Sequence, residues 1–180
     1  MKQSILAIDD ELHMLKLLER IISEKTDYPI TTINNSLEVP DFLKENKVDL
    51  IITDLKMPGM DGLDILKYIK ENDRSEEVVI MTAFGSLDTA LDALSQGVFD
   101  YITKPFKKEQ IIMTVDRAMR WQKVKVESER MSAIFDTEPY SAAIEAFKKE
   151  YVNRLKVRYS SESEMISKSG LTGEDLKYED

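Results

Sequence analysis

IITDLKMPGMDG, residues 51–62, joins an apolar run to an aspartate and then to a loop that contains a proline and two glycines. The apolar run belongs to a short, β-rich segment, Val48–Thr53, that polar residues hardly interrupt. Strands that are buried on both faces of a parallel sheet show runs of this kind. The stretch therefore predicts a buried parallel strand with Asp54 at its carboxyl end.

Four further runs of the same kind flank this stretch and alternate with segments of helical spacing. The runs are Ile5–Ile8, Ile30–Ile33, Val78–Thr82 and Val98–Ile102. Apolar residues at helical spacing occur over Leu12–Ile22, Leu63–Ile69 and Leu87–Leu94, and a closing helix is expected from about Lys107. This order predicts an α/β fold with a doubly wound, five-stranded parallel sheet, and such sheets carry their sites at the carboxyl ends of the strands.

Composition excludes several classes of site. The 180 residues contain no cysteine and a single histidine, His13, which rules out disulfides, thiolate zinc sites, cysteine nucleophiles and clustered histidine ligands. The formal net charge of −9 gives no general attraction to nucleic acid or to anionic membranes. No stretch approaches the roughly 18 apolar residues of a membrane span, so a cytoplasmic protein is expected.

Residues that carry chemistry stand at four of the predicted strand ends. Asp9 and Asp10 follow the first strand, Asp54 follows the third, Thr82 ends the fourth and Lys104 follows the fifth. These ends share one edge of a parallel sheet, so the three carboxylates would meet beside a hydroxyl and an ammonium. Crowded carboxylates need a cation, and an all-oxygen site with room for water suits Mg²⁺. The metal would neutralise an incoming phosphoryl group while Asp54 attacks phosphorus, and the lysine and hydroxyl would pair with phosphate oxygens.

Each of these residues also has an ordinary structural role. An aspartate pair such as Asp9-Asp10 is more often a helix N-cap, Thr82 could simply end a strand, and Lys104-Pro105 could be a turn. The combination of such residues at four strand ends favours a shared site over separate coincidences.

Residues 1 to about 120 resemble the receiver domains of bacterial two-component response regulators, which have a flavodoxin-like fold. The resemblance implies that Asp54 accepts a phosphoryl group from a partner sensor histidine kinase. It implies that Asp10 and Asp54 bind Mg²⁺ directly, with the backbone carbonyl of Lys56 as a third ligand and Asp9 acting mainly through water. His13 lies on the first predicted helix, and the resemblance gives it no role as a phosphodonor.

The same resemblance implies a conformational switch. Thr82 and Tyr101 would form the switch pair, Lys104 would contact the phosphate, and the Lys104–Pro105 peptide bond would be cis. Phosphate on Asp54 would draw Thr82 inward, open space for Tyr101 and shift the surface of the fourth helix, fifth strand and fifth helix. MTAFGS (residues 81–86) and YITKPF (residues 101–106) resemble receivers of the sigma-54 activator class.

The closing helix is expected to continue past the receiver-like region, because no glycine or proline occurs from Glu109 to about Phe135. Residues close to heptad spacing, mostly apolar with two polar gaps, are Ile112, Val115, Met119, Gln122, Val126, Glu129 and Ala133. This pattern favours pairing with a second copy, and hence a homodimer. The alternative is an amphipathic closing helix followed by a charged linker.

A boundary at residues 136–140 would divide the chain into a receiver domain (1–120), a helical linker (121–139) and a small all-helical tail (140–180). YSAAIEAFKKEYV (140–152) resembles the opening helix of the Fis-type C-terminal domain of sigma-54 activators, and SEMISKSGLT (163–172) resembles the start of its helix-turn-helix. The ATPase domain that usually separates these parts has no counterpart in this sequence, and no GxxxxGK motif occurs.

The end of the tail is too acidic for a typical DNA reader. A recognition helix needs arginine or lysine for phosphates and base edges. Residues 171–180 contain four acidic residues against Lys177 alone, a net charge of −3. The preceding basic residues fit a solvated helix face: Lys148, Lys149, Arg154, Lys156 and Arg158. We interpret the helix-turn-helix pattern as degenerate.

These observations favour a phosphorylation-controlled response regulator that acts through protein–protein contacts or dimerisation, with an unnamed downstream protein partner. A DNA-binding transcriptional regulator is the alternative. A phosphatase with an aspartyl-phosphate intermediate is disfavoured, because its motif needs an aspartate two residues after the nucleophile and Lys56 stands there. Apart from Mg²⁺-dependent phosphorylation and dephosphorylation of its own Asp54, the protein is not expected to be an enzyme.

Overall fold

The computed structural model describes residues 2–83, 90, 93–136, 148–149, 151–153, 155–156, 159 and 161–169. The chain forms two compact units, an N-terminal unit, Met1–Lys125, and a C-terminal unit, Val126–Asp180. The division falls a few residues beyond the expected end of the receiver domain at residue 120. Within the described part of the chain, no helix combines the length and the apolar character that a membrane span requires.

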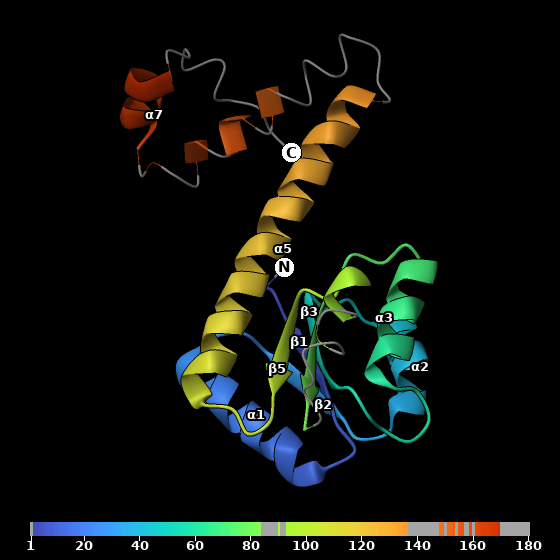
Figure 1. Ribbon diagram of the computed structural model, residues 1–180. Helices are drawn as coiled ribbons and strands as arrows, with labels where there is room; N and C mark the ends of the chain where they lie inside the picture. The colour runs from blue at the N-terminus through green and yellow to red at the C-terminus, as the bar shows by residue number, and fades with distance from the viewer. Residues whose placement is uncertain are drawn as a thin grey trace. The chain divides into compact units, whose positions relative to one another are not determined.

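The N-terminal unit is built on a five-stranded sheet (Figure 1). The strands are β1 (Ile5–Ile8), β2 (Ile30–Ile33), β3 (Leu50–Asp54), β4 (Glu77–Thr82) and β5 (Asp100–Thr103). Their order is β2-β1-β3-β4-β5, and all four neighbouring pairs are parallel. The predicted doubly wound parallel sheet is therefore confirmed.

Two strands begin later than the sequence predicted. β3 starts at Leu50 instead of Val48, and β5 starts at Asp100 instead of Val98. Both valines are buried in the same core cluster as strand residues, although they precede the strands. Their apolar character reports burial in the core and not pairing in the sheet.

Helices cover both faces of the sheet (Figure 1). α1 (Leu12–Lys25) and α5 (Lys108–Asp136) share a core cluster with one face, and α2 (Val39–Glu45) and α3 (Gly62–Glu71) share a cluster with the other. A short 3₁₀ helix, Ser36–Glu38, precedes α2. The sequence analysis did not locate α2, a helix of seven residues with a proline in its first turn. The helix expected over residues 87–94 falls mostly outside the described residues.

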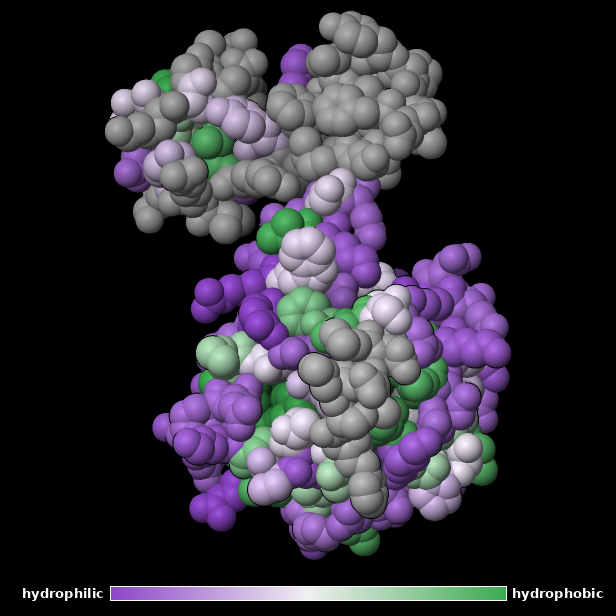
Figure 2. Space-filling model, viewed as in Figure 1, coloured by the Kyte–Doolittle hydropathy of each residue, from purple (hydrophilic) through white to green (hydrophobic). Residues whose placement is uncertain are grey.

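Alternate residues of each strand enter the two clusters. In β1, Ile5 and Ala7 face α1 and α5, whereas Leu6 and Ile8 belong to the cluster of α2 and α3. All four are fully buried. This period of two explains why β1, β3 and β4 read as continuous apolar runs, since both of their faces are covered. The edge strand β2 instead exposes Thr31 and Thr32. On the face of the molecule seen in Figure 2, hydrophilic residues accordingly dominate the margin of this unit.

The face of α5 that contacts the sheet differs from the face expected in a dimer. Val115, Met119 and Gln122, three positions of the heptad-like pattern, are buried in the N-terminal unit. Large apolar side chains are instead exposed at Met113, Trp121 and Val124. Within this unit, the predicted seam is therefore core of the same chain, and any pairing of α5 must use its outer face.

The described residues of the C-terminal unit form a small helical cluster. α7 spans Glu162–Ser169, and Val152 and Leu155 are buried against partly buried side chains, those of Tyr159, Met165 and Ile166. Lys148, Lys149 and Lys156 are exposed, in line with the expected solvated face. Residues 140–147 and 170–180, which carry much of the predicted helix-turn-helix pattern and its acidic end, lie outside the described residues.

Candidate functional site

The candidate site lies at the carboxyl edge of the sheet, where four neighbouring strands end. Asp54 is the last residue of β3, Thr82 is the last residue of β4, Asp9 follows β1 and Lys104 follows β5. The register aligns these ends, since Ile8 pairs with Thr53, Asp54 with Met81 and Thr82 with Thr103. The structure thus brings these four strand ends to one edge of the sheet, as predicted from the sequence.

The alternation of the strands puts three of these residues on the same side of the sheet. Each follows by two positions a buried residue of the α1–α5 cluster: Asp9 follows Ala7, Asp54 follows Ile52 and Lys104 follows Ile102. Because side chains two apart along a strand point to the same face, the two carboxylates and the lysine converge. Thr82 follows Ile80 and so belongs to the opposite face.

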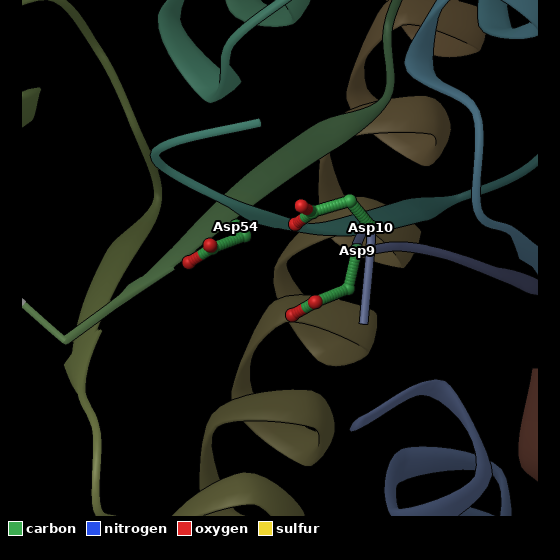
Figure 3. Close-up of side chains that lie close together, drawn as sticks. All are labelled: Asp9, Asp10 and Asp54. Carbon is green, nitrogen blue, oxygen red and sulfur yellow. The ribbon is translucent and has the colours of Figure 1, made fainter. Parts of the chain in front are cut away.

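Asp9, Asp10 and Asp54 each offer a carboxylate oxygen, and these three atoms lie within 4.8 Å of one another. In Figure 3 the three carboxyl groups point to the same side. Asp9 is fully buried and Asp54 is 8% exposed, whereas Asp10 is open to solvent. The cluster therefore combines two desolvated carboxylates with one that water can reach.

Lys104 supplies the positive charge of the site. Its Nζ lies 2.8 Å from Asp9 Oδ2 and 3.2 Å from Asp54 Oδ1, and the side chain is only 11% exposed. Asp9 also accepts a hydrogen bond from the Glu11 N–H at 2.9 Å. The Lys104–Pro105 peptide bond is cis, as the resemblance implied.

Burial and charge pull in opposite directions on the two sides of this ion pair. Burial raises the pKa of Asp54 and outweighs the nearby Lys104 ammonium, which lowers it. For Lys104, burial favours the neutral amine, but Asp9 and Asp54 together outweigh it and raise the pKa of the ammonium. Lys104 therefore stays charged, while ionised Asp54 is held in an environment that a further cation would relieve.

The donor set fits a magnesium ion. All three side chains offer oxygen, and Asp10 lies on the open side, where waters could complete an octahedral shell. Within the described part of the molecule, Asp54 Oδ1 is buried without a well-directed hydrogen bond, and its contact with Lys104 Nζ at 3.2 Å is an ion pair. A buried carboxylate oxygen that accepts no well-directed hydrogen bond is a position where a bound cation would supply a further partner.

The loop after Asp54 explains the glycine that closes the opening stretch. A Cβ on Gly62 would lie 2.7 Å from the Asp54 carbonyl oxygen, so only glycine permits this approach. The Gly62 N–H donates to the Leu55 carbonyl at 3.1 Å, and Asp61 caps α3 in a capping box with Asp64. α3 therefore begins directly against the strand end that carries Asp54.

The expected switch residues lie on one face of the sheet. Thr82 is 1% exposed, and Tyr101 is partly buried against the α2–α3 cluster. Tyr101 pairs with Ile80, two residues before Thr82, so both project toward the same side. Lys56 lies in the loop directly after Asp54, with its ammonium 3.8 Å from Asp61. His13 is exposed beside Glu11.

One network between β5 and α5 was missed by the sequence analysis. Asp100, the first residue of β5, accepts hydrogen bonds from Thr114 and Arg117 of α5. The Arg117 guanidinium also lies over the Phe99 ring, 5.6 Å from its centroid. No local pattern marks this network, because its members are 14 and 17 residues apart along the chain.

Comparison with known proteins gives a consistent result. The model of the response regulator receiver domain family matches residues 5–116. The DNA-binding transcriptional regulator NtrC of Klebsiella pneumoniae is 40% identical over 112 residues, which are 62% of this chain and 24% of that protein. The chain thus spans about a quarter of the length of this curated relative.

Solved structures of receiver domains have the same fold. The signal receiver domain of a putative Luxo repressor protein from Vibrio parahaemolyticus superimposes with a TM-score of 0.68 at 28% identity, over 72% of this chain and 98% of that one. The beryllofluoride-activated NtrC4 receiver domain dimer gives a TM-score of 0.62 at 31% identity, over 66% of this chain and 98% of that one.

Proposed function

The chain belongs to the response regulator receiver domain family, and from that premise we propose that it is a two-component response regulator in which Asp54 accepts a phosphoryl group from a sensor histidine kinase. The observation that carries this proposal is the convergence of Asp9, Asp10 and Asp54 with Lys104 at one edge of the sheet. Phosphoryl transfer is governed by positioning and charge neutralisation, and this edge provides both.

The proposed reaction moves one phosphoryl group. A carboxylate oxygen of Asp54 attacks the phosphorus of the kinase phosphohistidine, a new O–P bond forms, and the P–N bond breaks with its electron pair going to the imidazole nitrogen. The product is an acyl phosphate on Asp54 and a histidine that takes up a proton. Hydrolysis later returns Asp54 and inorganic phosphate, so the chain's own catalysis is limited to this residue.

Asp10, Asp54 and the backbone carbonyl of Lys56 would hold the magnesium ion, with Asp9 contacting it through water. When bound, the ion supplies charge neutralisation at the phosphoryl oxygens. Asp9 also orients Lys104, because its Oδ2 accepts a hydrogen bond from Lys104 Nζ at 2.8 Å. Lys104 Nζ lies 3.2 Å from Asp54 Oδ1. The ammonium would therefore be close enough to pair with an oxygen of a phosphoryl group on Asp54.

We propose that Thr82 and Tyr101 transmit phosphorylation to the outer surface. The Thr82 hydroxyl would move toward the phosphate, and Tyr101 would fill the space that it leaves. Their common side of the sheet and the partial burial of Tyr101 support this pairing. The surface that changes would be that of the fourth helix, β5 and α5, where Asp100 and Arg117 join the strand to the helix.

A homodimer is proposed through the outer face of α5. Met113, Trp121 and Val124 are each more than half exposed, and they lie on the side of the helix opposite the buried Val115. A hollow of about 710 Å³ runs along the same face, beside Met113 and Arg120. An NtrC4 receiver domain of similar fold was solved as a dimer, which supports association without specifying its geometry.

The output is proposed to act through a protein partner. We propose the division into a receiver (1–120), a linker (121–139) and a tail (140–180) that derives from a Fis-type domain without an intervening ATPase. The family match ends at residue 116, and the names of DNA-binding relatives say nothing about this tail. DNA binding is the less favoured alternative because the net charge of −3 on residues 171–180 opposes contact with phosphates.

Acetyl phosphate or beryllofluoride with Mg²⁺, followed by intact mass and size measurement, tests the proposal. We expect one added phosphoryl group in acetyl phosphate, no addition in Asp54→Ala, and full addition in the matched control Asp41→Ala, an exposed aspartate of α2. Addition that survives Asp54→Ala would refute the site. A gel shift at low and moderate salt, with free and phosphorylated protein, tests the DNA-binding alternative. If neither form binds DNA, that alternative is wrong.

A further inference from the structure

Ser36 is a buried polar residue that the proposed reaction does not use. It is 2% exposed and begins the short helix between β2 and α2. Its Oγ donates a hydrogen bond to the Pro58 carbonyl oxygen at 2.8 Å and accepts one from the Met60 N–H at 2.9 Å. Both partners belong to the loop between Asp54 and α3, 22 and 24 residues away along the chain. A single hydroxyl therefore holds that loop on two sides of its turn.

The turn between these two hydrogen bonds is shaped to accept the serine. Gly59 has φ +86°, a left-handed conformation that glycine adopts without strain. A Cβ at Gly59 would lie 2.8 Å from Leu37 Cγ and 3.0 Å from Ser36 Oγ. The loop backbone is thus packed directly onto residues 36 and 37, and a side chain at position 59 would push it away.

The ends of the loop are held independently of Ser36. At one end the Leu55 N–H donates to the Met81 carbonyl at 2.7 Å, and at the other Asp61 caps α3. Between these anchors, among the described residues, both hydrogen bonds that join residues 57–60 to a segment outside the loop are made by Ser36. The backbone conformation in the middle of the loop therefore depends on this hydroxyl.

We infer that Ser36 is a positioning residue for the magnesium site, because it fixes the loop that contains Lys56, whose backbone carbonyl we propose as a ligand with Asp10 and Asp54. This inference rests on the proposed function. The carbonyl of a loop residue can bind a metal tightly only if its direction is set before binding, since ordering the backbone afterwards costs conformational entropy. Ser36 touches neither the metal nor the phosphoryl group, and it acts through the loop.

The test compares Ser36→Ala with Ser36→Thr, which keeps the hydroxyl, and with Ser23→Ala, an exposed serine of α1. Amide hydrogen exchange without metal should show faster exchange at Met60 in Ser36→Ala alone. Mg²⁺ titration, followed by amide chemical shifts of Gly59 and Gly62, should show affinity reduced about three- to tenfold, which corresponds to the net contribution of about one hydrogen bond. Ser36→Thr should fall between wild type and Ser36→Ala.

Phosphorylation by acetyl phosphate gives a second readout. In Ser36→Ala the Mg²⁺ concentration for half-maximal rate should rise by the same factor as the dissociation constant, while the rate at saturating Mg²⁺ stays near wild type. Gly59→Ala, which displaces the loop from the other side, should have the same effect. If Ser36→Ala does not fold, the Mg²⁺ dependence of Gly59→Ala alone tests whether the loop conformation controls metal affinity.

Two results separate this inference from the function on which it rests. Wild-type Mg²⁺ affinity in a folded Ser36→Ala whose Met60 amide exchanges faster would overturn the positioning role and leave Asp54 phosphorylation intact. Failure of the wild-type chain to bind Mg²⁺ or to gain a phosphoryl group would overturn the proposed function itself.

Discussion

The N-terminal and C-terminal units differ in how much of each is core. Two clusters of fifteen buried residues lie on the two faces of the sheet in the first unit, whereas the described residues of the second contain two buried apolar residues, Val152 and Leu155. The burial of apolar side chains in these two clusters offsets the free-energy cost of burying the charged side chains Asp9 and Asp54. The residues of the proposed phosphorylation site all lie in the first unit, so we expect stability and switching to respond mainly to changes there.

The largest expected effect comes from the core of the N-terminal unit. Ile51→Ala removes a fully buried side chain from β3, the middle strand, and should lower the free energy of unfolding by about 4 kcal/mol. Leu155→Ala, the matched change in the C-terminal unit, should leave the unfolding transition of the first unit unchanged. Urea denaturation followed by circular dichroism measures both.

The same pair of variants tests whether the two units unfold independently. An equal loss of stability in Leu155→Ala and Ile51→Ala would mean that the two units unfold as one. In that case the C-terminal unit would be part of the scaffold of the site and not an attachment to it.

The second expected effect lies at the site. Lys104→Met leaves the fully buried Asp9 without its ion-pair partner and should cost about 3 kcal/mol of stability at neutral pH. Mg²⁺ should restore part of the loss, because the metal replaces the missing positive charge. Thermal unfolding with and without Mg²⁺ measures this.

Lys56→Met is the control for Lys104→Met, because this lysine is in the neighbouring loop but its side chain is 69% exposed. It should change the melting temperature little in either condition. If the two variants behave alike, the buried position of Lys104 is not what makes it matter.

Much of the N-terminal unit could be predicted from sequence, because its signals are local. Each buried strand is a short apolar run, and each strand end carries its own polar residue. Parallel pairing then brings the ends together without further information, which is why Asp54 and Lys104 could be assigned to one pocket. The strand limits at Val48 and Val98 were wrong because apolar residues pack in the core on both sides of a strand boundary.

The remaining features depend on contacts that no local pattern encodes. Ser36 reads as an ordinary loop serine until the fold puts it against Pro58 and Met60. The heptad-like pattern of α5 has two explanations, since the same spacing serves a core face or a dimer seam. Because Val115 and Met119 are buried, the pattern marks the core-facing side of α5 within the first unit.

The third expected effect, that of Asp54→Asn, is a smaller change that raises stability, whereas the two preceding substitutions lower it. The pKa of Asp54 is raised above its ordinary value of 3.8, mainly by burial. The folded state then binds a proton more tightly than the unfolded state, so stability falls as pH rises from that value through the raised pKa. Asp54→Asn removes this cost and should raise the melting temperature at neutral pH, with a gain that vanishes below about pH 3.8.

Asp41→Asn, on the exposed surface of α2, is the matched control and should show no such pH dependence. Mg²⁺ should raise the melting temperature of wild type more than that of Asp54→Asn, because the variant lacks one anionic ligand. A pH-independent gain in Asp54→Asn would contradict the electrostatic explanation.

The smallest expected effect tests the base of α5, the helix that continues from one unit into the other. Lys108, in its first turn, lies 2.7 Å from Glu24 at the end of α1, and Arg20 lies 2.9 Å from the same carboxylate. The hydrogen bond from Lys108, followed by that from Arg20, lowers the pKa of Glu24 to about 2. Its stabilisation is therefore present above the ordinary value of 4.5 and is lost as pH falls toward 2.

Glu24→Gln should lower the melting temperature of the N-terminal unit slightly at pH 7, and the difference should shrink at pH 3 and in 1 M NaCl, where screening acts within about 3 Å. Glu71→Gln, which removes a looser pair with Lys67 at 3.8 Å, is the control and should change less. A loss in Glu24→Gln that persists in high salt would mean that packing, and not charge, holds α5 to α1. The first turn of α5 would then be held to α1 by packing, and these ion pairs would not be needed to fix it there.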